Sequence, residues 1–304
     1  MTDTLTAPIS TDTAVPVWQD DPRYDPDSQA DQDFMFDLYG FGMLRSALSS
    51  NELDEINAFV DRQDYENLEP GEWIGDIETH TYGAKDGINF QNIVEAGPIF
   101  ERCIDHPAWY ERVRRYIEAD AHRLSIDENF LNIRKSGGFI PIHSGGNHVR
   151  FTSCFRAYYG AWMVGQINIL IALTDIGHGD GCTTVIPGSH KVHEKHPLSL
   201  DGAAWSRGVT GAEAVGMVQV HLKAGDALMF TDAIMHGSMP RTNAGERRVM
   251  IYRYAPHLLA KRHNYIPSDE LMARLSERQR LMVEPQPPRL RPGRTITGSA
   301  NPPR

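Results

Sequence analysis

From Phe130 onward the chain alternates between short apolar runs and turn residues. The clearest run spans 164–173 and places a branched apolar residue at every second position: Ile167, Ile169, Ile171 and Leu173. A period of two is typical of a strand with one buried face. Similar runs follow at 215–222, 226–231 and 247–254. The pattern therefore predicts that this part of the chain is mainly β.

Helical spacing dominates the part of the chain before Phe130. The apolar segment 34–44, broken by two glycines, predicts a short helix that turns into a first strand. Ser49 and Glu52 have the spacing of a capping box, and apolar residues then recur at helical intervals through Val60. Pro98 opens a second helical stretch, and 268–282 predicts a surface helix. The glycine-rich segment 64–98 indicates strands and loops.

Many short strands after two helical stretches predict a mainly β protein with flanking helices. The expected core is a double-stranded β-helix (a jelly roll, cupin-like) with the helices packed outside. Residues 1–30 are polar, acidic and dotted with prolines, which predicts a flexible N-terminal arm. Residues 31–284 are expected to form a single jelly-roll catalytic domain, and 285–304 a proline-rich tail.

Composition and charge exclude several classes of protein. Apolar residues make up 40% of the chain and charged residues 23%, as in ordinary globular proteins. A formal net charge of −10 argues against binding a nucleic acid polymer. No apolar run reaches the roughly 18 residues of a membrane helix, and the N-terminus lacks a basic-then-apolar signal. Three cysteines without metal spacing indicate reduced thiols, so we expect a cytoplasmic protein without a membrane partner.

The chemistry centres on two histidines and an absent acid. Many non-haem iron sites use two histidines and one carboxylate, the first pair written His-x-Asp or His-x-Glu. Here His143 is followed by Ser and then Gly145, where that pattern has the acid. His236 lies at a second strand-to-turn junction, and Arg247 follows it by eleven residues. These residues are the candidate metal and ligand site.

Four separated motifs resemble the phytanoyl-CoA dioxygenase family. They are Asp-Gly-Cys-Thr-Thr-Val-Ile-Pro-Gly-Ser-His-Lys at 180–191, Ala-Gly-Asp at 224–226, Met-His-Gly-Ser at 235–238 and the arginine pair at 247–248. The similarity covers roughly 34–258. It implies a jelly-roll enzyme that uses Fe(II), 2-oxoglutarate and O2. The motif around His190 is mainly a turn, and we expect that histidine to be structural.

The resemblance also implies roles for individual residues. The iron ligands fall on His143 and His236, and the arginine that clamps the far carboxylate of 2-oxoglutarate falls on Arg247, since a guanidinium pairs with a carboxylate bidentately. Arg253 would share a strand face with Arg247, so alternation leaves both open, and the spacing from the distal histidine favours Arg247. Auxiliary 2-oxoglutarate contacts fall on two further residues, Asn132 and Ser238.

Gly145 sets this chain apart from the family pattern. The nearby acids Asp127 and Glu128 are expected to lie on the far side of a strand from His143. Glycine removes a ligand atom and a negative charge, and chloride can restore both. His-x-Gly resembles the iron and 2-oxoglutarate halogenases, which implies chloride as a further cofactor, bound at Gly145. The alternatives are a hydroxylase and a non-catalytic binding protein, the latter disfavoured because both histidines and Arg247 are retained.

The substrate is expected to be a small molecule. Candidate contacts lie between the first ligand and the main strand, at His148, Arg150 and Arg156. Basic and aromatic side chains together suit an anionic, flat substrate. The alternative is an ordinary solvated loop. The glycine variant also resembles the nucleotide halogenases of actinobacterial purine-antibiotic pathways, which implies a purine deoxynucleotide such as deoxyadenosine monophosphate (dAMP).

Overall fold

A computed structural model describes residues 21–81, 86–117, 123–145, 151–158, 161–200, 214–259 and 265–285. Three parts of the predictions lie outside these ranges: residues 1–20 of the arm, residues 286–304 of the tail, and the candidate substrate contacts His148 and Arg150.

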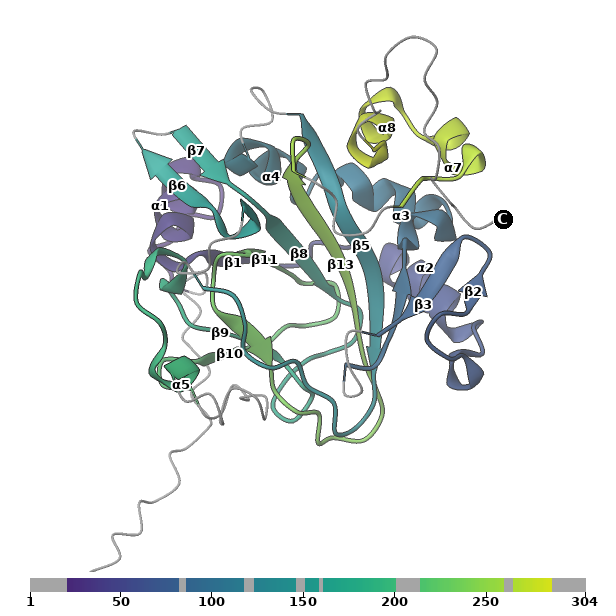
Figure 1. Cartoon of the computed structure of the whole chain (residues 1–304), viewed down its shortest axis with the longest axis horizontal. Helices are drawn as coiled ribbons and strands as arrows, with labels where there is room; N and C mark the ends of the chain where they lie inside the picture. Colours follow the sequence, from purple (N-terminus) through teal and green to yellow (C-terminus); the bar gives the residue numbers. More distant parts are fainter. Residues whose placement is uncertain are drawn as a thin grey trace, which may run out of the picture.

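Two antiparallel sheets face each other and form the core of the fold (Figure 1). The large sheet has the strand order β1-β11-β8-β13-β5-β4-β3-β2. Its strands are β1 (Phe41–Leu44), β2 (Trp73–Ile74), β3 (Ile77–His80), β4 (Ile88–Gln91), β5 (Leu124–Arg134), β8 (Ile167–Ala172), β11 (Ala227–Thr231) and β13 (Arg247–Pro256). The small sheet has the order β10-β9-β12, from β9 (Thr183–Val185), β10 (Val218–Val220) and β12 (His236–Ser238). Strands β6 (Phe155–Tyr158) and β7 (Ala161–Val164) form a hairpin.

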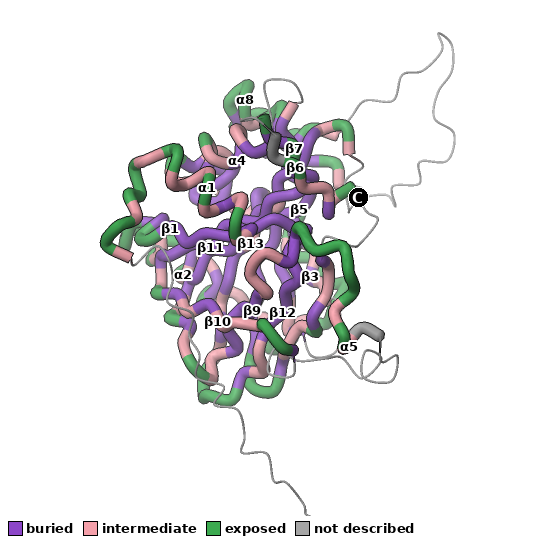
Figure 2. Tube along the Cα trace, turned by 90° about the vertical axis from the view of Figure 1, so that its left-hand side faces the viewer, coloured by how far each residue is buried: buried purple, intermediate pink, exposed green. Residues whose placement is uncertain are grey.

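Alternation along the strands divides the apolar residues between two cores. Side chains of the large sheet such as Leu170, Phe230 and Val249 pack against Val185 and Val220 of the small sheet. This face of the large sheet is called the inner face below. Figure 2 shows the strands as the most buried part of the chain. A jelly roll with helices packed outside is confirmed.

The helices cover the outer face of the large sheet. They are α1 (Gln29–Tyr39), α2 (Ser50–Asp61), α3 (Pro98–Arg102), α4 (Tyr110–Ile117), α7 (Asp269–Arg274) and α8 (Glu277–Val283), while α5 (Pro197–Leu200) lies near the small sheet (Figure 1). Outward residues Met250, Tyr252 and Tyr254 join their apolar core. The hydroxyl of Tyr254 accepts a hydrogen bond from Trp109 Nε1 at 2.9 Å, so these buried polar tips are satisfied.

Local signals in the N-terminal part gave the right elements. Helix α1 turns into β1 through Gly40, whose φ of 79° is the left-handed conformation of a helix C-cap. Ser49 and Glu52 form the predicted capping box at the start of α2. The helical stretch from Pro98 is divided into α3 and α4, with Trp109 and Val113 fully buried as its periodicity predicted.

Two predicted elements are each divided in the structure. The run 164–173 is not one strand: β7 ends at Val164 and β8 begins at Ile167. A Cβ on Gly165 would lie 1.8 Å from the carbonyl oxygen of Phe151, so this glycine allows a close backbone crossing that interrupts the strand. The predicted helix 268–282 is two helices, because Ser276 starts α8 with its own capping box.

No described helix has both the length and the apolar content needed to cross a membrane.

Candidate functional site

The two candidate metal ligands lie side by side on the small sheet. His143 and His236 form an antiparallel backbone bridge, with N–O distances of 2.8 Å from His143 N and 3.0 Å from His236 N. The centroids of their rings are 4.1 Å apart. His236 begins β12, so the bridge extends the small sheet to the loop that carries His143. The sequence placed the two residues in corresponding contexts, and the register of this sheet brings them together.

The hydrogen bonds of both rings set the tautomer that a metal requires. His143 Nδ1 lies 2.9 Å from the carbonyl of Pro141, and His236 Nδ1 lies 2.8 Å from the carbonyl of Ile234. Since a carbonyl only accepts, each Nδ1 donates its proton and each Nε2 carries the lone pair. Burial, followed by the neighbouring His143, lowers the pKa of His236 to about 3. Both properties suit metal ligation by neutral imidazoles.

Gly145 has a backbone conformation that favours glycine itself. Its φ is 113°, and Ser144 before it has a φ of 63°. A side chain at such a φ is strained. The backbone at position 145 therefore favours glycine and does not have the conformation expected for an aspartate. In the described ranges, no group of three or more His, Cys, Asp or Glu side chains is arranged to hold a metal. Within those ranges the histidine pair is thus not completed by a carboxylate.

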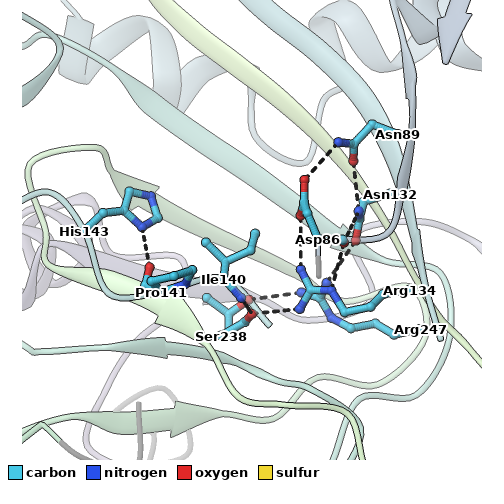
Figure 3. Close-up of polar contacts among 10 residues, drawn as sticks. Asp86, Asn89, Asn132, Arg134, Ile140, Pro141, His143, Ser238 and Arg247 are labelled. Atoms are coloured by element: carbon cyan, nitrogen blue, oxygen red, sulfur yellow. Dashed lines mark hydrogen bonds and ion pairs between the residues drawn. The ribbon is translucent and has the colours of Figure 1, made fainter. Parts of the chain in front are cut away.

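Arg247 is a buried cation without a carboxylate partner among the described residues (Figure 3). It is 3% exposed. Its NH1 and NH2 groups make only long contacts of 3.4 Å, to Asn132 Oδ1 and Thr183 Oγ1, and its Nε has no partner in the described chain. Burial, and then the charge of Arg134, lower the pKa of Arg247 to about 9. A buried guanidinium in this state favours an anionic ligand.

Arg134 lies opposite Arg247 on β5 and was not among the predicted site residues. It donates to Ser238 Oγ at 2.7 Å and to the backbone carbonyl of Asp86 at 3.0 Å, and its NH2 lies 3.5 Å from the Asp86 carboxylate. Two guanidiniums therefore face one carboxylate, which leaves an excess positive charge. The only signal in the sequence was its position two residues after Asn132, on the same strand face.

Asn132 and Ser238, the predicted auxiliary residues, both join this cluster (Figure 3). Asn132 Nδ2 donates to Asn89 Oδ1 at 2.8 Å and to the Asp86 carbonyl at 3.0 Å. Ser238 Oγ accepts from the backbone N–H of Ile140 at 2.8 Å, three residues before His143. Ser238 thus ties the arginine cluster to the loop that carries the first histidine. The residues Asp86, Asn89, Asn132, Arg134, Ser238 and Arg247 are called the arginine cluster below.

Arg253 shares the inner face with Arg247, but it has a counter-ion. It forms an ion pair with Glu128, whose side chain is fully buried. The expectation that Asp127 and Glu128 lie on the far side of a strand from His143 is wrong for Glu128, because Glu128 is the direct neighbour of the inward-facing Arg253 across β5 and β13. Asp232 is a further acid that the sequence reading missed. It is buried, and its charge acts on His236, opposing the lowering of that pKa.

The remaining predicted residues lie farther from the chemistry. Arg156 is exposed on the β6–β7 hairpin. His190 is buried, with Nε2 3.0 Å from the Asp37 carbonyl and its ring 4.3 Å from that of Phe155. Burial lowers the pKa of His190 to about 4, which agrees with a structural role.

Known proteins share this fold and parts of this sequence. The solved structure of HygX from Streptomyces hygroscopicus, with nickel and 2-oxoglutarate bound, aligns with a TM-score of 0.66 at 18% identity over 80% of this chain and 93% of HygX. In sequence, the dioxygenase cdmD of Talaromyces verruculosus is 36% identical over 88 residues, covering 29% of this chain and 23% of cdmD. The dioxygenase ALT11 of Alternaria alternata is 30% identical over 137 residues, covering 44% of this chain and 41% of ALT11.

The chain therefore spans less than half the length of each of these two curated relatives. The family model described as phytanoyl-CoA dioxygenase (PhyH) matches residues 36–249, close to the extent expected from the motifs. This match includes both histidines, Gly145 and Arg247. The chain belongs to the phytanoyl-CoA dioxygenase family, a family of oxidoreductases.

Proposed function

We propose that this protein is an Fe(II)- and 2-oxoglutarate-dependent halogenase that chlorinates an unactivated C–H bond of a small molecule. A purine deoxynucleotide such as dAMP is the candidate substrate. One observation carries the proposal: beside the paired histidines, the position of the usual acid is a buried glycine with a φ of 113°. A glycine supplies no ligand atom and no charge at this position, so a halide can take the coordination position of the acid.

The described residues fit the cofactors on two independent points. His143 and His236 both present Nε2 lone pairs, as Fe(II) requires of imidazole ligands. Arg247, with its partnerless Nε, is suited to the distant carboxylate of 2-oxoglutarate, and Asn132 and Ser238 flank it. When bound, iron, 2-oxoglutarate and O2 supply the oxidant that cleaves a C–H bond, and chloride supplies the halogen.

The chain contributes the positions of the reacting groups. Two carbonyls fix the ring orientations of the histidines. The arginine cluster would hold a carboxylate of 2-oxoglutarate through the buried cation of Arg247. HygX has been solved with iron bound and with nickel and 2-oxoglutarate bound, which supports the proposal of iron and 2-oxoglutarate for this chain.

Hydroxylation is the second candidate function, because one acid lies near the site. Asp232 precedes His236 by four residues, is buried and acts on its pKa. Asp232 is not grouped with the two histidines in the described arrangement. If its carboxylate reorients onto the iron, chloride has no position and the product gains oxygen. The curated relatives named as dioxygenases support this class of reaction equally well.

The test compares the products of native protein and two variants at Gly145 with dAMP as substrate. Mass spectrometry of reactions in chloride and in bromide is expected to show a chlorinated and a brominated product from the native protein. Gly145→Asp is expected to abolish halogen incorporation, since its carboxylate competes for the halide position. Gly145→Ala adds a side chain without a charge and measures the strain at this φ, about 1–2 kcal/mol.

One result contradicts the proposal, and a second removes the support that Gly145→Asp would give it. A native product that gains oxygen in both salts identifies a hydroxylase, and loss of that activity in Asp232→Asn would assign the acid. Equal loss of activity in Gly145→Ala and Gly145→Asp would show that loop strain, rather than competition with a halide, explains the Gly145→Asp result.

A further inference from the structure

A second row of polar side chains crosses the inner face at some distance along the strands from the arginine cluster. Asn168 on β8 is the register partner of Arg253 on β13, and Arg253 is the register partner of Glu128 on β5. Gln91 on β4 continues the row, because its Nε2 donates to Glu128 Oε1 at 3.1 Å. These four residues are called the polar row below.

Asn168, Gln91 and Glu128 of the polar row are buried, Arg253 is largely buried, and specific contacts hold all four. Asn168 is 1% exposed and Gln91 is 2% exposed. Asn168 Oδ1 accepts from Gln166 Nε2 at 3.0 Å, which fixes the orientation of its amide. The Arg253 guanidinium pairs with Glu128 and lies over the ring of Phe130, 5.2 Å from the centroid. Each side chain is thus held in place by a neighbour in the sheet.

Three atoms of the row nevertheless have no hydrogen-bond partner in the described part of the chain. They are two donors, Arg253 Nε and Asn168 Nδ2, and one acceptor, Gln91 Oε1. Leaving a buried polar atom unsatisfied costs about 1–3 kcal/mol, so native proteins tolerate few of them. Three in one row of adjacent strands are most simply explained by a ligand that satisfies them.

The row lies next to the histidine pair. Phe230 on β11 packs edge-on against His236, with ring centroids 4.9 Å apart, and the same Phe230 is the register partner of Asn168. One aromatic residue therefore separates the proposed metal ligand from the row. The distance suits a substrate whose reactive carbon lies at the histidines while another part of it reaches the row.

Charge decides what kind of group binds there. The positive charge of Arg253 is already balanced by Glu128, and Asp232 adds a further acid near His236. An anion such as phosphate would meet two carboxylates and a neutralised cation. A neutral group that accepts from two N–H donors and donates to one amide oxygen matches the three unsatisfied atoms. Hydroxyl groups of a sugar, an amide and the edge of a nucleobase have this chemistry.

We propose that the polar row is the substrate-recognition site, and that it binds a neutral hydrogen-bonding group of the substrate rather than its anionic part. This inference rests on the proposed function for its orientation toward the histidines. It assigns Asn168, Arg253 and Gln91 as substrate contacts. For a nucleotide, the row would bind the base or the sugar hydroxyl, and the phosphate would lie elsewhere.

The experiment uses the full chain without iron and two fragment probes, acetamide and inorganic phosphate. Crystals soaked in each probe locate it, and NMR titration of the backbone amides of β8 and β13 gives its affinity. Acetamide is expected at the row, bonded to Asn168 Nδ2 and Gln91 Oε1, with phosphate absent there. Asn168→Asp keeps the acceptor for Gln166 but removes the donor, so acetamide should bind about tenfold more weakly.

Thr184→Val is the matched control. Thr184 is also buried and its Oγ1 also lacks a partner in the described chain, but it lies on β9 of the other sheet. This variant should bind acetamide as the native protein does. The inference is overturned if phosphate occupies the row, if ordered water remains there against acetamide, or if both variants bind acetamide equally. Because no turnover is measured, these outcomes are independent of whether the protein halogenates.

Discussion

Arg247 and Arg253 lie on the same face of one strand and share a barrel interior, but their surroundings differ. Arg253 has a buried carboxylate as its register partner, whereas the register partner of Arg247 is a second arginine. The first arrangement is neutral. The second carries an excess positive charge, because among the described residues the two guanidiniums of Arg134 and Arg247 share the single carboxylate of Asp86. The comparison indicates that a missing counter-ion, more than the arginine itself, identifies the site of an anionic ligand.

The inner face has two regions that suit two different kinds of ligand. The arginine cluster is charged and suits a carboxylate of a cosubstrate. The polar row is neutral and suits hydroxyl or amide groups. The histidine pair is connected to the cluster through Ser238 and to the row through Phe230. Four predictions, from the largest expected effect to the smallest, test this division.

Removing the counter-ion of Arg253 should make the two arginines alike. In Glu128→Gln the largely buried guanidinium of Arg253 loses its compensating charge, so the free energy of unfolding should fall by about 3 kcal/mol. Urea unfolding followed by circular dichroism measures it. An unfolding free energy within error of the native value would show that the Arg253–Glu128 pair does not stabilise the fold. Arg253 could then not be used as the charge-balanced counterpart of Arg247.

Replacing the guanidinium of Arg247 by an ammonium group should weaken the binding of the cosubstrate alone. Arg247→Lys keeps the charge but loses the bidentate fork, so the affinity for 2-oxoglutarate should fall about 100-fold. Anaerobic titration of the Fe(II) protein, followed by its visible absorbance, measures this affinity. Arg253→Lys is the matched control and should change it little. A larger loss in Arg253→Lys would reverse the assignment of the two arginines.

An apolar substitution should give opposite stability changes at the two positions. Arg247→Met removes an uncompensated buried charge, so the protein without ligands should gain about 1 kcal/mol. Arg253→Met removes the ion-pair partner of the buried Glu128 carboxylate, so it should lower stability. Thermal melting without 2-oxoglutarate compares the two variants. If both variants lose stability to the same extent, Arg247 has a structural role, and the two arginines do not differ in charge compensation.

Ser238→Ala should have the smallest effect. The hydroxyl accepts from Arg134 and from the N–H of Ile140, so its loss should loosen the link between the arginine cluster and the His143 loop. One such hydrogen bond contributes about 1 kcal/mol, which predicts about a fivefold weaker affinity for 2-oxoglutarate. Calorimetric titration of the metal-loaded protein measures it. Unchanged affinity would place Ser238 outside the cosubstrate site.

Much of the fold was determined locally and could be predicted from the sequence. Alternating apolar residues identified β8, since side chains on a strand must divide between two faces, and short apolar runs between turn residues identified β11 and β13. The capping box at Ser49 identified the start of α2, because the orphan N–H groups of a helix are satisfied within one turn. The order of the motifs identified the family, and their spacing nominated the histidines and Arg247.

The tertiary structure decided what depends on register and on close approach. The backbone of Phe151 crosses close to Gly165 and divides the expected strand. The periodicity of residues 164–173 contains no information about this contact with another part of the chain. Whether Glu128 faces the interior depends on its pairing with Arg253, which lies 125 residues away. The counter-ions of the two arginines follow from the same register. Electrostatic energy depends on distances in space, so only the folded chain distinguishes two arginines that the sequence places on equal terms.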